Sequence, residues 1–108
     1  MKRIIVVLAL TALASSALAA GNADRGAEKA KQVCAACHGA DGNTPLQPDY
    51  PRIAGQHGYY LYKALRDYQS GARKNAIMGS QAATLSRQEM LDLAAYFSGL
   101  PGSLGVIR

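Results

Sequence analysis

The sequence predicts a small all-α domain with long loops, and three features of the chain support this fold class. Three segments carry apolar residues at helical spacing and have capping residues at their ends. No segment alternates apolar and polar residues as a half-buried strand would. Glycine and proline gather between the helical segments, which indicates connecting loops.

The first predicted helix begins near Asn22 or Asp24, because either side chain can cap it, and it runs into Cys34. Its apolar stripe is small and contains Ala27, Ala30 and Val33. Residues 39–50 follow as a loop, since turn residues and prolines oppose regular structure there.

The second predicted helix begins at His57 or Tyr59 and ends at Ser70, where Gly71 is a typical stop signal. Its apolar face contains leucine, alanine and tyrosine residues at helical spacing. Residues 72–82 are then expected to be irregular.

The third helix has the clearest start, because Ser86 and Glu89 have the spacing of a capping box. It is expected to end near Leu100, where glycine and proline interrupt the pattern. Met90 lies on its apolar face and is therefore expected in the core.

Residues 1–19 have the pattern of a cleaved secretory signal peptide. Lys2 and Arg3 precede an apolar run that ends in Ala17-Leu18-Ala19, which has the form of a cleavage site. A retained membrane anchor is the alternative. However, a membrane span needs about 20 apolar residues, and this run is shorter and contains polar residues. We therefore expect a mature domain of residues 20–108 in the periplasm.

A mature domain of this size is hard to stabilise by its own core, and it has one Phe and no Trp. A disulfide, a metal or a large apolar cofactor would supplement that core. A disulfide between Cys34 and Cys37 would close a very small loop and would add little stability.

The segment Cys34-Ala35-Ala36-Cys37-His38 has the attachment pattern of c-type haem. Two thiols at this spacing on a helix can both reach one side of a porphyrin, and the next residue places an imidazole on the iron. A thiol redox site is less suitable, because it usually belongs to a strand-then-helix unit. A zinc site would need a fourth ligand, for which His57 is the main candidate.

The second axial position of the iron has three candidates in the mature chain: Met78, Met90 and His57. Met90 is expected in the core, and an isolated histidine such as His57 is more often a surface residue. Met78 lies in the segment expected to be irregular, 40 residues beyond His38, and it matches the known His/Met mode.

The mature chain resembles the class I c-type cytochromes, most closely the bacterial single-haem periplasmic carriers and the halves of two-haem carriers. The matching stretches are residues 34–43, 51–56, 60–65, 71–73 with Met78, and 85–86 leading to 93–96. The resemblance implies a class I cytochrome c fold, with three main helices and long loops around one covalently attached haem c. It also places a methionine ligand in the loop that matches Met78. We expect a monomer.

The resemblance further assigns residues around the haem. The carbonyl of Pro51 would accept a hydrogen bond from His38, although a plain turn proline is the alternative. Gly26 and Tyr96 match the residues where the first and last helices cross in this family. Candidates for contacts with haem propionates or with the methionine segment, which could equally be ordinary surface or core residues, are Tyr59, Tyr60, Arg73 and Asn75.

A haem with both axial positions filled cannot readily bind oxygen or peroxide, so we expect an electron carrier rather than an enzyme. The implied partners are redox proteins: a membrane cytochrome complex, a terminal oxidase or a periplasmic dehydrogenase. The alternatives are a haem c subunit of a periplasmic oxidoreductase complex, a peroxidase and a ligand-sensing haem protein.

Charge restricts the partners only weakly. Removal of residues 1–19 leaves ten basic against seven acidic residues, so the formal charge falls from +5 to about +3. We expect no nucleic-acid partner and no stable membrane insertion. Arg73 and Lys74 could belong to a docking rim for an acidic partner or to an ordinary solvated basic face.

Overall fold

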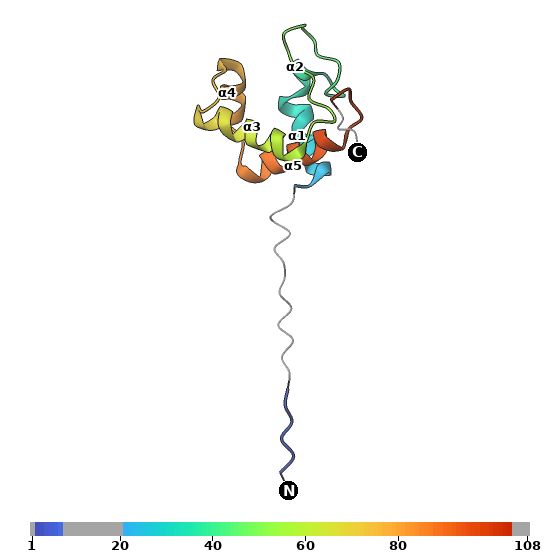
Figure 1. Ribbon diagram of the computed structural model, residues 1–108, viewed down its shortest axis with the longest axis vertical. Helices are drawn as coiled ribbons and strands as arrows, with labels where there is room; N and C mark the ends of the chain where they lie inside the picture. Colours follow the sequence, from blue (N-terminus) through green and yellow to red (C-terminus); the bar gives the residue numbers. More distant parts are fainter. Residues whose placement is uncertain (1, 8–20, 105–108) are drawn as a thin grey trace.

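The computed structural model describes residues 2–7 and 21–104 of the chain. Residues 2–7 have no regular secondary structure and lie away from the helical part, with their apolar side chains exposed (Figure 1). The predicted signal segment 1–19 falls mostly outside the described residues. Within the described part of the chain, no helix has both the length and the apolar character needed to cross a membrane.

Residues 21–104 fold into five helices without a β-strand, which agrees with the predicted fold class. Helix α5 packs against both α1 and α3, while α4 packs against α3 (Figure 1). The three long helices correspond to the three predicted ones. The bounds are α1 Ala23–Val33, α2 Ala35–His38, α3 Gly58–Ser70, α4 Ala76–Ala83 and α5 Arg87–Gly99.

The predicted helix ends agree with the structure. The side chain of Asn22 accepts a hydrogen bond from the backbone N–H of Arg25 and caps α1. Helix α3 ends at Gly71, whose φ of 85° lies in the left-handed region that favours glycine. Ser86 and Glu89 form both hydrogen bonds of the capping box at the start of α5.

Two short helices differ from the prediction. The first helix is interrupted at Cys34, and the chain continues in α2 for four residues. The segment expected to be irregular contains α4, so that expectation was wrong for residues 76–83. The side chain of Asn75 caps α4 by accepting from the N–H groups of Ile77 and Met78. Only Ala82 of α4 is buried, so the helix has no apolar stripe from which it could have been predicted.

The core lies where α1, α3 and α5 meet. Met90 and Leu93 are 2% and 1% exposed, and the expectation that Met90 is a core residue is confirmed. Partly buried residues of α3, including Leu61 and Leu65, pack against this cluster. The other buried members of the cluster are Ala30, Leu85 and Phe97.

Helices α1 and α5 cross at Gly26, as expected from the sequence. A Cβ atom on Gly26 would collide with the backbone carbonyl of Asp92 and would lie 2.8 Å from the Cβ of Tyr96. Glycine therefore allows the two backbones to approach closely at this crossing.

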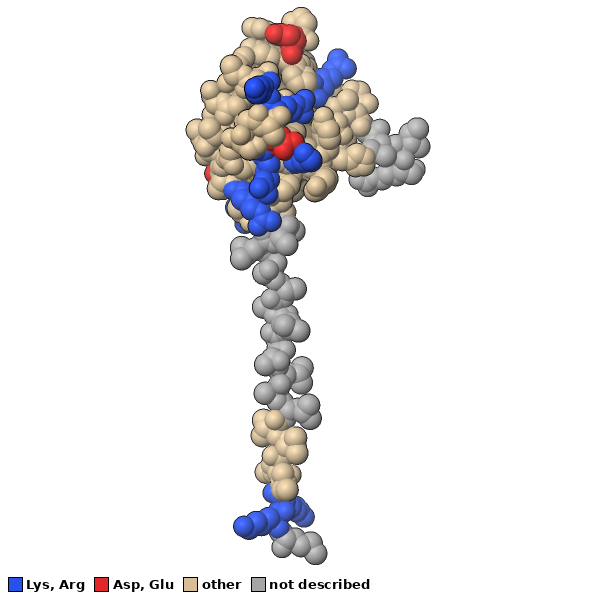
Figure 2. All heavy atoms as spheres, turned by 60° about the vertical axis from the view of Figure 1, so that its left-hand side comes forward, with Lys and Arg blue, Asp and Glu red and all other residues tan. Residues whose placement is uncertain are grey.

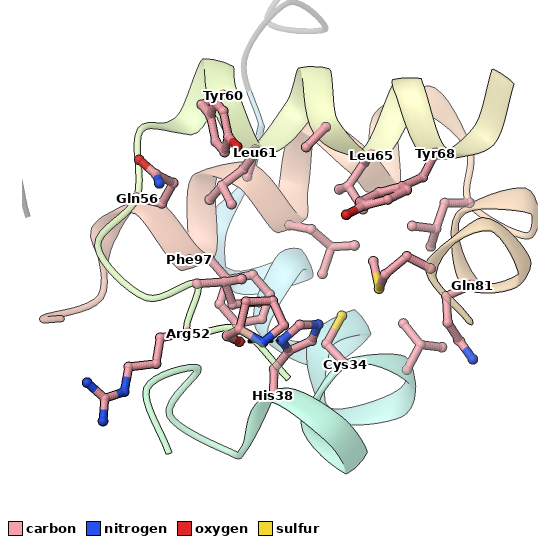
Figure 3. A pocket seen from close by; sticks show the side chains of 18 of the residues that line it. Cys34, His38, Arg52, Gln56, Tyr60, Leu61, Leu65, Tyr68, Gln81 and Phe97 are labelled. Atoms are coloured by element: carbon pink, nitrogen blue, oxygen red, sulfur yellow. Dashed lines mark hydrogen bonds between the residues drawn. The ribbon is translucent and has the colours of Figure 1, made fainter. Parts of the chain in front are cut away.

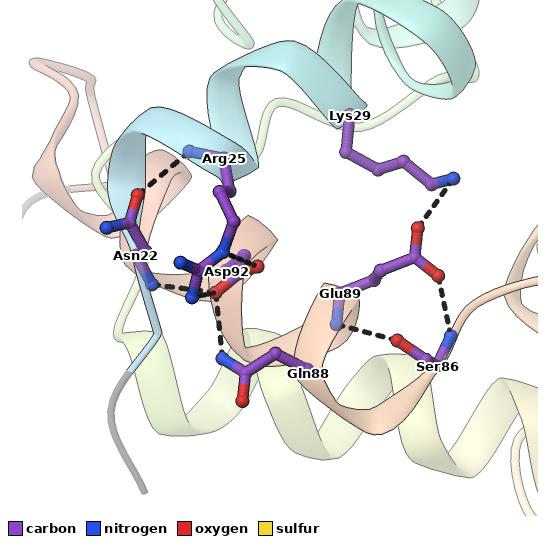
Figure 4. Close-up of polar contacts among 7 residues, drawn as sticks. All are labelled: Asn22, Arg25, Lys29, Ser86, Gln88, Glu89 and Asp92. Atoms are coloured by element: carbon purple, nitrogen blue, oxygen red, sulfur yellow. Dashed lines mark hydrogen bonds and ion pairs between the residues drawn. The ribbon is translucent and has the colours of Figure 1, made fainter. Parts of the chain in front are cut away.

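A polar network fastens the same crossing (Figure 4). The buried carboxylate of Asp92 accepts hydrogen bonds from the backbone N–H of Asn22 at 2.7 Å, from Arg25 Nε at 3.0 Å and from Gln88 Nε2 at 2.9 Å. One turn earlier, the carboxylate of Glu89 forms an ion pair with Lys29, at 2.6 Å. These bonds hold the start of α1 against α5.

Candidate functional site

A cavity of about 280 Å³ lies between the α1–α2 segment and helices α3, α4 and α5. Figure 3 shows Cys34 reaching it from the junction of α1 and α2 and His38 reaching it from α2. Leu61, Leu65 and Tyr68 reach it from α3. Phe97 of α5 and Gln81 of α4 also lie along its wall. Most of these side chains are apolar, so the cavity suits a flat hydrophobic group.

His38 ends α2 and is buried at the edge of this cavity, with 6% of its surface exposed. Its Nδ1 lies 2.8 Å from the carbonyl oxygen of Pro51, which is the contact expected from the sequence (Figure 3). A carbonyl oxygen can only accept, so in the neutral imidazole Nδ1 carries the proton and Nε2 has the lone pair. An imidazole in this tautomer is ready to ligate a metal through Nε2.

The two cysteines are not joined in a disulfide. Cys34 lines the cavity, whereas Cys37 is half-buried and is not among the lining residues. Burial raises the pKa of the Cys34 thiol to about 11, although the charge of Lys29 opposes this shift. A protonated thiol is a poor nucleophile, so Cys34 does not have the properties of a thiol redox catalyst.

The described residues contain no group of three or more His, Cys, Asp or Glu side chains that could hold a metal ion. His57, the remaining candidate for a zinc site, is exposed at the start of α3 and does not line the cavity. The zinc alternative therefore lacks a ligand set in this part of the chain.

Met78 lines the cavity from α4 rather than from the expected loop. Its helix is joined to α3 by Gln69, whose Nε2 donates to the carbonyl oxygens of Ala82 at 2.9 Å and Leu85 at 2.8 Å. No prediction from the sequence includes Gln69. Its role depends on the tertiary approach of α3 and α4, and no sequence motif indicates it.

The remaining predicted residues are divided between the cavity and other positions. Arg73 lines the cavity, stacks over the ring of Tyr68 at 4.8 Å and donates to the hydroxyl of Tyr60 at 3.4 Å. Tyr59 is 76% exposed and does not line the cavity. Asn75 caps α4 and does not line it either.

These residues fit a covalently attached haem. The cavity brings an imidazole, a thioether and a buried thiol to one apolar space, and a second thiol lies three residues after the first. Imidazole and thioether are the axial ligands of a low-spin haem, and two thiols at this spacing can anchor its edge.

Comparison with known proteins identifies the family. The family described as "Cytochrome c" matches residues 23–101. Cytochrome c4 of Pseudomonas aeruginosa is 44% identical over 107 residues, which cover 98% of this chain and 52% of that protein. A thiosulfate dehydrogenase electron acceptor of Stutzerimonas stutzeri is 45% identical over 76 residues, which cover 70% of this chain and 35% of that protein.

A shorter relative and a crystal structure identify the same family. Cytochrome c-554(548) of Halomonas halodenitrificans is 42% identical over 82 residues, which cover 73% of this chain and 96% of that protein. The crystal structure of reduced cytochrome c4 from Pseudomonas stutzeri superposes with a TM-score of 0.71 at 42% identity, over 78% of this chain and 48% of that one.

The chain thus spans about half the length of its cytochrome c4 relatives and nearly the whole of cytochrome c-554(548). Both the matched family and the all-α fold are those implied by the resemblance in the sequence. The chain belongs to the cytochrome c family, and haem c is its covalently attached cofactor.

Proposed function

We propose that the chain is an exported electron carrier in which His38 and Met78 ligate the iron of one haem c. The observation that carries this proposal is that His38 and Met78 both line the same apolar cavity. With an imidazole and a thioether on the iron, no position is left for a substrate. When bound, the haem supplies a reversible one-electron ferric–ferrous couple.

The protein's own residues prepare the site for that role. Cys34 and Cys37 would hold the cofactor covalently, and the Pro51 carbonyl fixes the His38 ring through Nδ1, which would leave Nε2 to ligate the iron. The apolar wall, including Leu65 and Phe97, excludes water from the site. Arg73 places a positive charge at the wall, which favours the reduced iron.

The proposed location is the periplasm, after removal of residues 1–19, because those residues have the pattern of a secretory signal. The proposed partners are redox proteins: a membrane cytochrome complex, a terminal oxidase or a periplasmic dehydrogenase. The relative that is a thiosulfate dehydrogenase electron acceptor supports a partner of the dehydrogenase class. We propose that the carrier acts as a monomer.

The test is an optical spectrum of the holoprotein in both redox states, combined with a potentiometric titration. We expect low-spin iron in both states and, in the ferric state, the absorption band of a methionine–iron bond. Met78→Leu should abolish this band and lower the reduction potential, because sulfur ligation favours ferrous iron. Met90→Leu is the matched control, since Met90 is a buried core residue that does not line the cavity, and it should retain the band.

High-spin iron in the wild-type protein would contradict the proposal. So would binding of carbon monoxide to the untreated ferrous protein, which would instead favour a ligand sensor or a peroxidase. A methionine band that survives Met78→Leu would refute the ligand assignment while leaving the haem itself in place.

A further inference from the structure

The chain that follows α5 packs against the loop that leads to α3. We call residues 100–104 the post-α5 segment and residues 51–55 the proline segment. Figure 1 shows the post-α5 segment, in dark red, beside the loop between α2 and α3. A Cβ atom on Gly102 would lie 2.1 Å from the carbonyl oxygen of Ala54, which is a fully buried residue. Glycine therefore allows the two backbones to approach closely at this point.

A second contact joins the same two segments at Gly55. Its backbone N–H donates to the carbonyl oxygen of Phe97, near the end of α5, at 2.9 Å. A Cβ atom on Gly55 would lie 3.3 Å from both the backbone nitrogen of Gly102 and the carbonyl oxygen of Leu100. The end of α5 and the post-α5 segment thus hold the proline segment together.

The loop after α2 also holds the proline segment. The carbonyl oxygen of Gly42 accepts hydrogen bonds from two N–H groups of the proline segment, at 2.8 Å and 3.0 Å, and one of these groups belongs to Ala54. The contacts of Gly42 and Gly102 therefore meet at Ala54. The carbonyl of Pro51, three residues earlier, is the group that lies 2.8 Å from Nδ1 of His38.

The post-α5 segment ends at the haem cavity. Leu104 lines this cavity together with His38 and Pro51, and it is 38% exposed, so it lies at the mouth. Residues 100–104 contain no charged side chain, and the Lys and Arg side chains that Figure 2 shows gathered over one side of the domain belong to other segments. The contact therefore consists of backbone and apolar packing, which salt should not weaken.

We propose that the post-α5 segment holds the Pro51 carbonyl in place against His38 and that Gly102 is the positioning residue. The inference rests on the proposed function, since it assigns a support for the histidine ligand of the same iron. A ring N–H bonded to a carbonyl orients the imidazole and makes it a stronger donor through Nε2. The post-α5 segment thus acts on the ligand through the proline segment, from outside the attachment motif.

The experiment follows the Nδ1 proton of His38 by NMR in the ferrous holoprotein, where low-spin iron is diamagnetic. The position of this resonance and the rate of exchange of the proton with deuterium oxide are measured. Gly102→Ala is compared with Gly99→Ala, because a Cβ atom on Gly99 would have nothing within 4 Å. Neither glycine has a positive φ, so the two variants differ in the contact that the methyl group meets and not in backbone strain.

In Gly102→Ala, we expect the His38 proton to exchange about fivefold faster, which corresponds to the loss of one hydrogen bond. Its resonance should move upfield, because the bond to the Pro51 carbonyl is weakened. Gly99→Ala should change neither quantity, and the backbone amides of α1 should keep their wild-type exchange rates in both variants. Leu104→Ala introduces no new atom and removes the side chain at the cavity mouth, so it should accelerate the exchange to a smaller extent.

An unchanged resonance and exchange rate in Gly102→Ala would overturn the proposal. If that variant does not form holoprotein, the same result in Leu104→Ala would overturn it. Equal acceleration of exchange in α1 would also overturn it, because a loss of overall stability would then explain the change. Paramagnetic ferrous iron in the wild-type protein would instead refute the proposed function, since an imidazole and a thioether together keep the iron low-spin. The two failures are therefore distinguishable.

Discussion

The two sides of the haem cavity are built differently. On the His38 side, the proposed ligand is buried and its ring is bonded to the Pro51 carbonyl. The preceding helix α1 is fastened to α5 by the Asp92 network. On the Met78 side, the candidate ligand stands on α4, where only Ala82 is buried. Gln69 of α3 donates one hydrogen bond to Ala82, at the end of α4, and one to Leu85, in the segment that follows α4.

This difference indicates that the two sides of the cavity are held with unequal firmness. His38 is buried and bonded to the Pro51 carbonyl, so displacing its imidazole would break that bond and disturb a buried site. The Met78 side can open locally, because few buried contacts oppose the movement of α4. In the proposed carrier, the haem would be held firmly and the bond from Met78 to the iron would be the more easily broken one.

The largest effect should follow from breaking the network between α1 and α5 at Asp92. Asp92→Ala leaves the guanidinium of Arg25 and the N–H of Asn22 without their carboxylate partner. We expect the free energy of unfolding of the holoprotein to fall by about 3 kcal/mol, as measured by urea titration. Asp24→Ala, at an exposed position in the first turn of α1, is the control and should cost less than about 1 kcal/mol. Equal costs for the two variants would mean that the network does not fasten the helices.

A smaller and local effect should follow on the Met78 side. Gln69→Leu removes the bond to Ala82, at the end of α4, and the bond to Leu85 just after it, worth about 2 kcal/mol together. We expect faster replacement of the methionine by added imidazole in the ferric protein, with the His38 ligation retained. The absorption band of the methionine–iron bond reports this exchange. Gln32→Leu, at an exposed position of α1, should leave the exchange rate unchanged; a similar acceleration there would show that Gln69 does not position α4.

The cap of α5 should contribute less. Ser86→Ala removes the side-chain acceptor for the N–H of Glu89 and should cost about 1 kcal/mol of unfolding free energy. Ser86→Thr keeps the acceptor and should restore most of the loss. If both variants are equally stable in thermal unfolding, the capping box does not contribute as described.

The smallest effect should be a change in the free energy of unfolding that appears only at acidic pH. Burial of Asp92 opposes its ionisation, but hydrogen bonds from Arg25, the Asn22 N–H and Gln88 outweigh burial and hold its pKa below the ordinary value. The stability from this carboxylate is therefore complete above the unfolded-state pKa of about 4, and it is lost as pH falls through the lower folded-state pKa. Asp92→Asn should flatten this acid dependence in urea titrations. An unchanged pH profile in the variant would exclude Asp92 as its source.

The features that could be predicted from the sequence are those determined locally. The capping box of Ser86 and Glu89, the stop at Gly71 and the spacing of Cys34, Cys37 and His38 each lie within a few residues, so the pattern carries the information. The contact between His38 and Pro51 was expected from the family resemblance rather than from spacing.

The features that were missed depend on tertiary approach. Helix α4 has one buried residue and no apolar stripe, and its one local signal was Asn75, which was instead considered a haem contact. Gln69 gains its role only because α3 places it beside the end of α4. Tyr59 faces solvent because Tyr60, its neighbour on α3, takes the position facing the cavity.

Hydrogen–deuterium exchange of the ferric holoprotein, resolved by helix, tests the unequal construction of the two sides most directly. We expect the amides of α4 to exchange through openings that require at least about 2 kcal/mol less free energy than those of α1 and α5. Gln69→Leu should lower the protection of α4 further and leave α1 and α5 unchanged. Equal protection of all three helices in the wild-type protein would contradict the account, because the Met78 side would then be as firmly held as the His38 side.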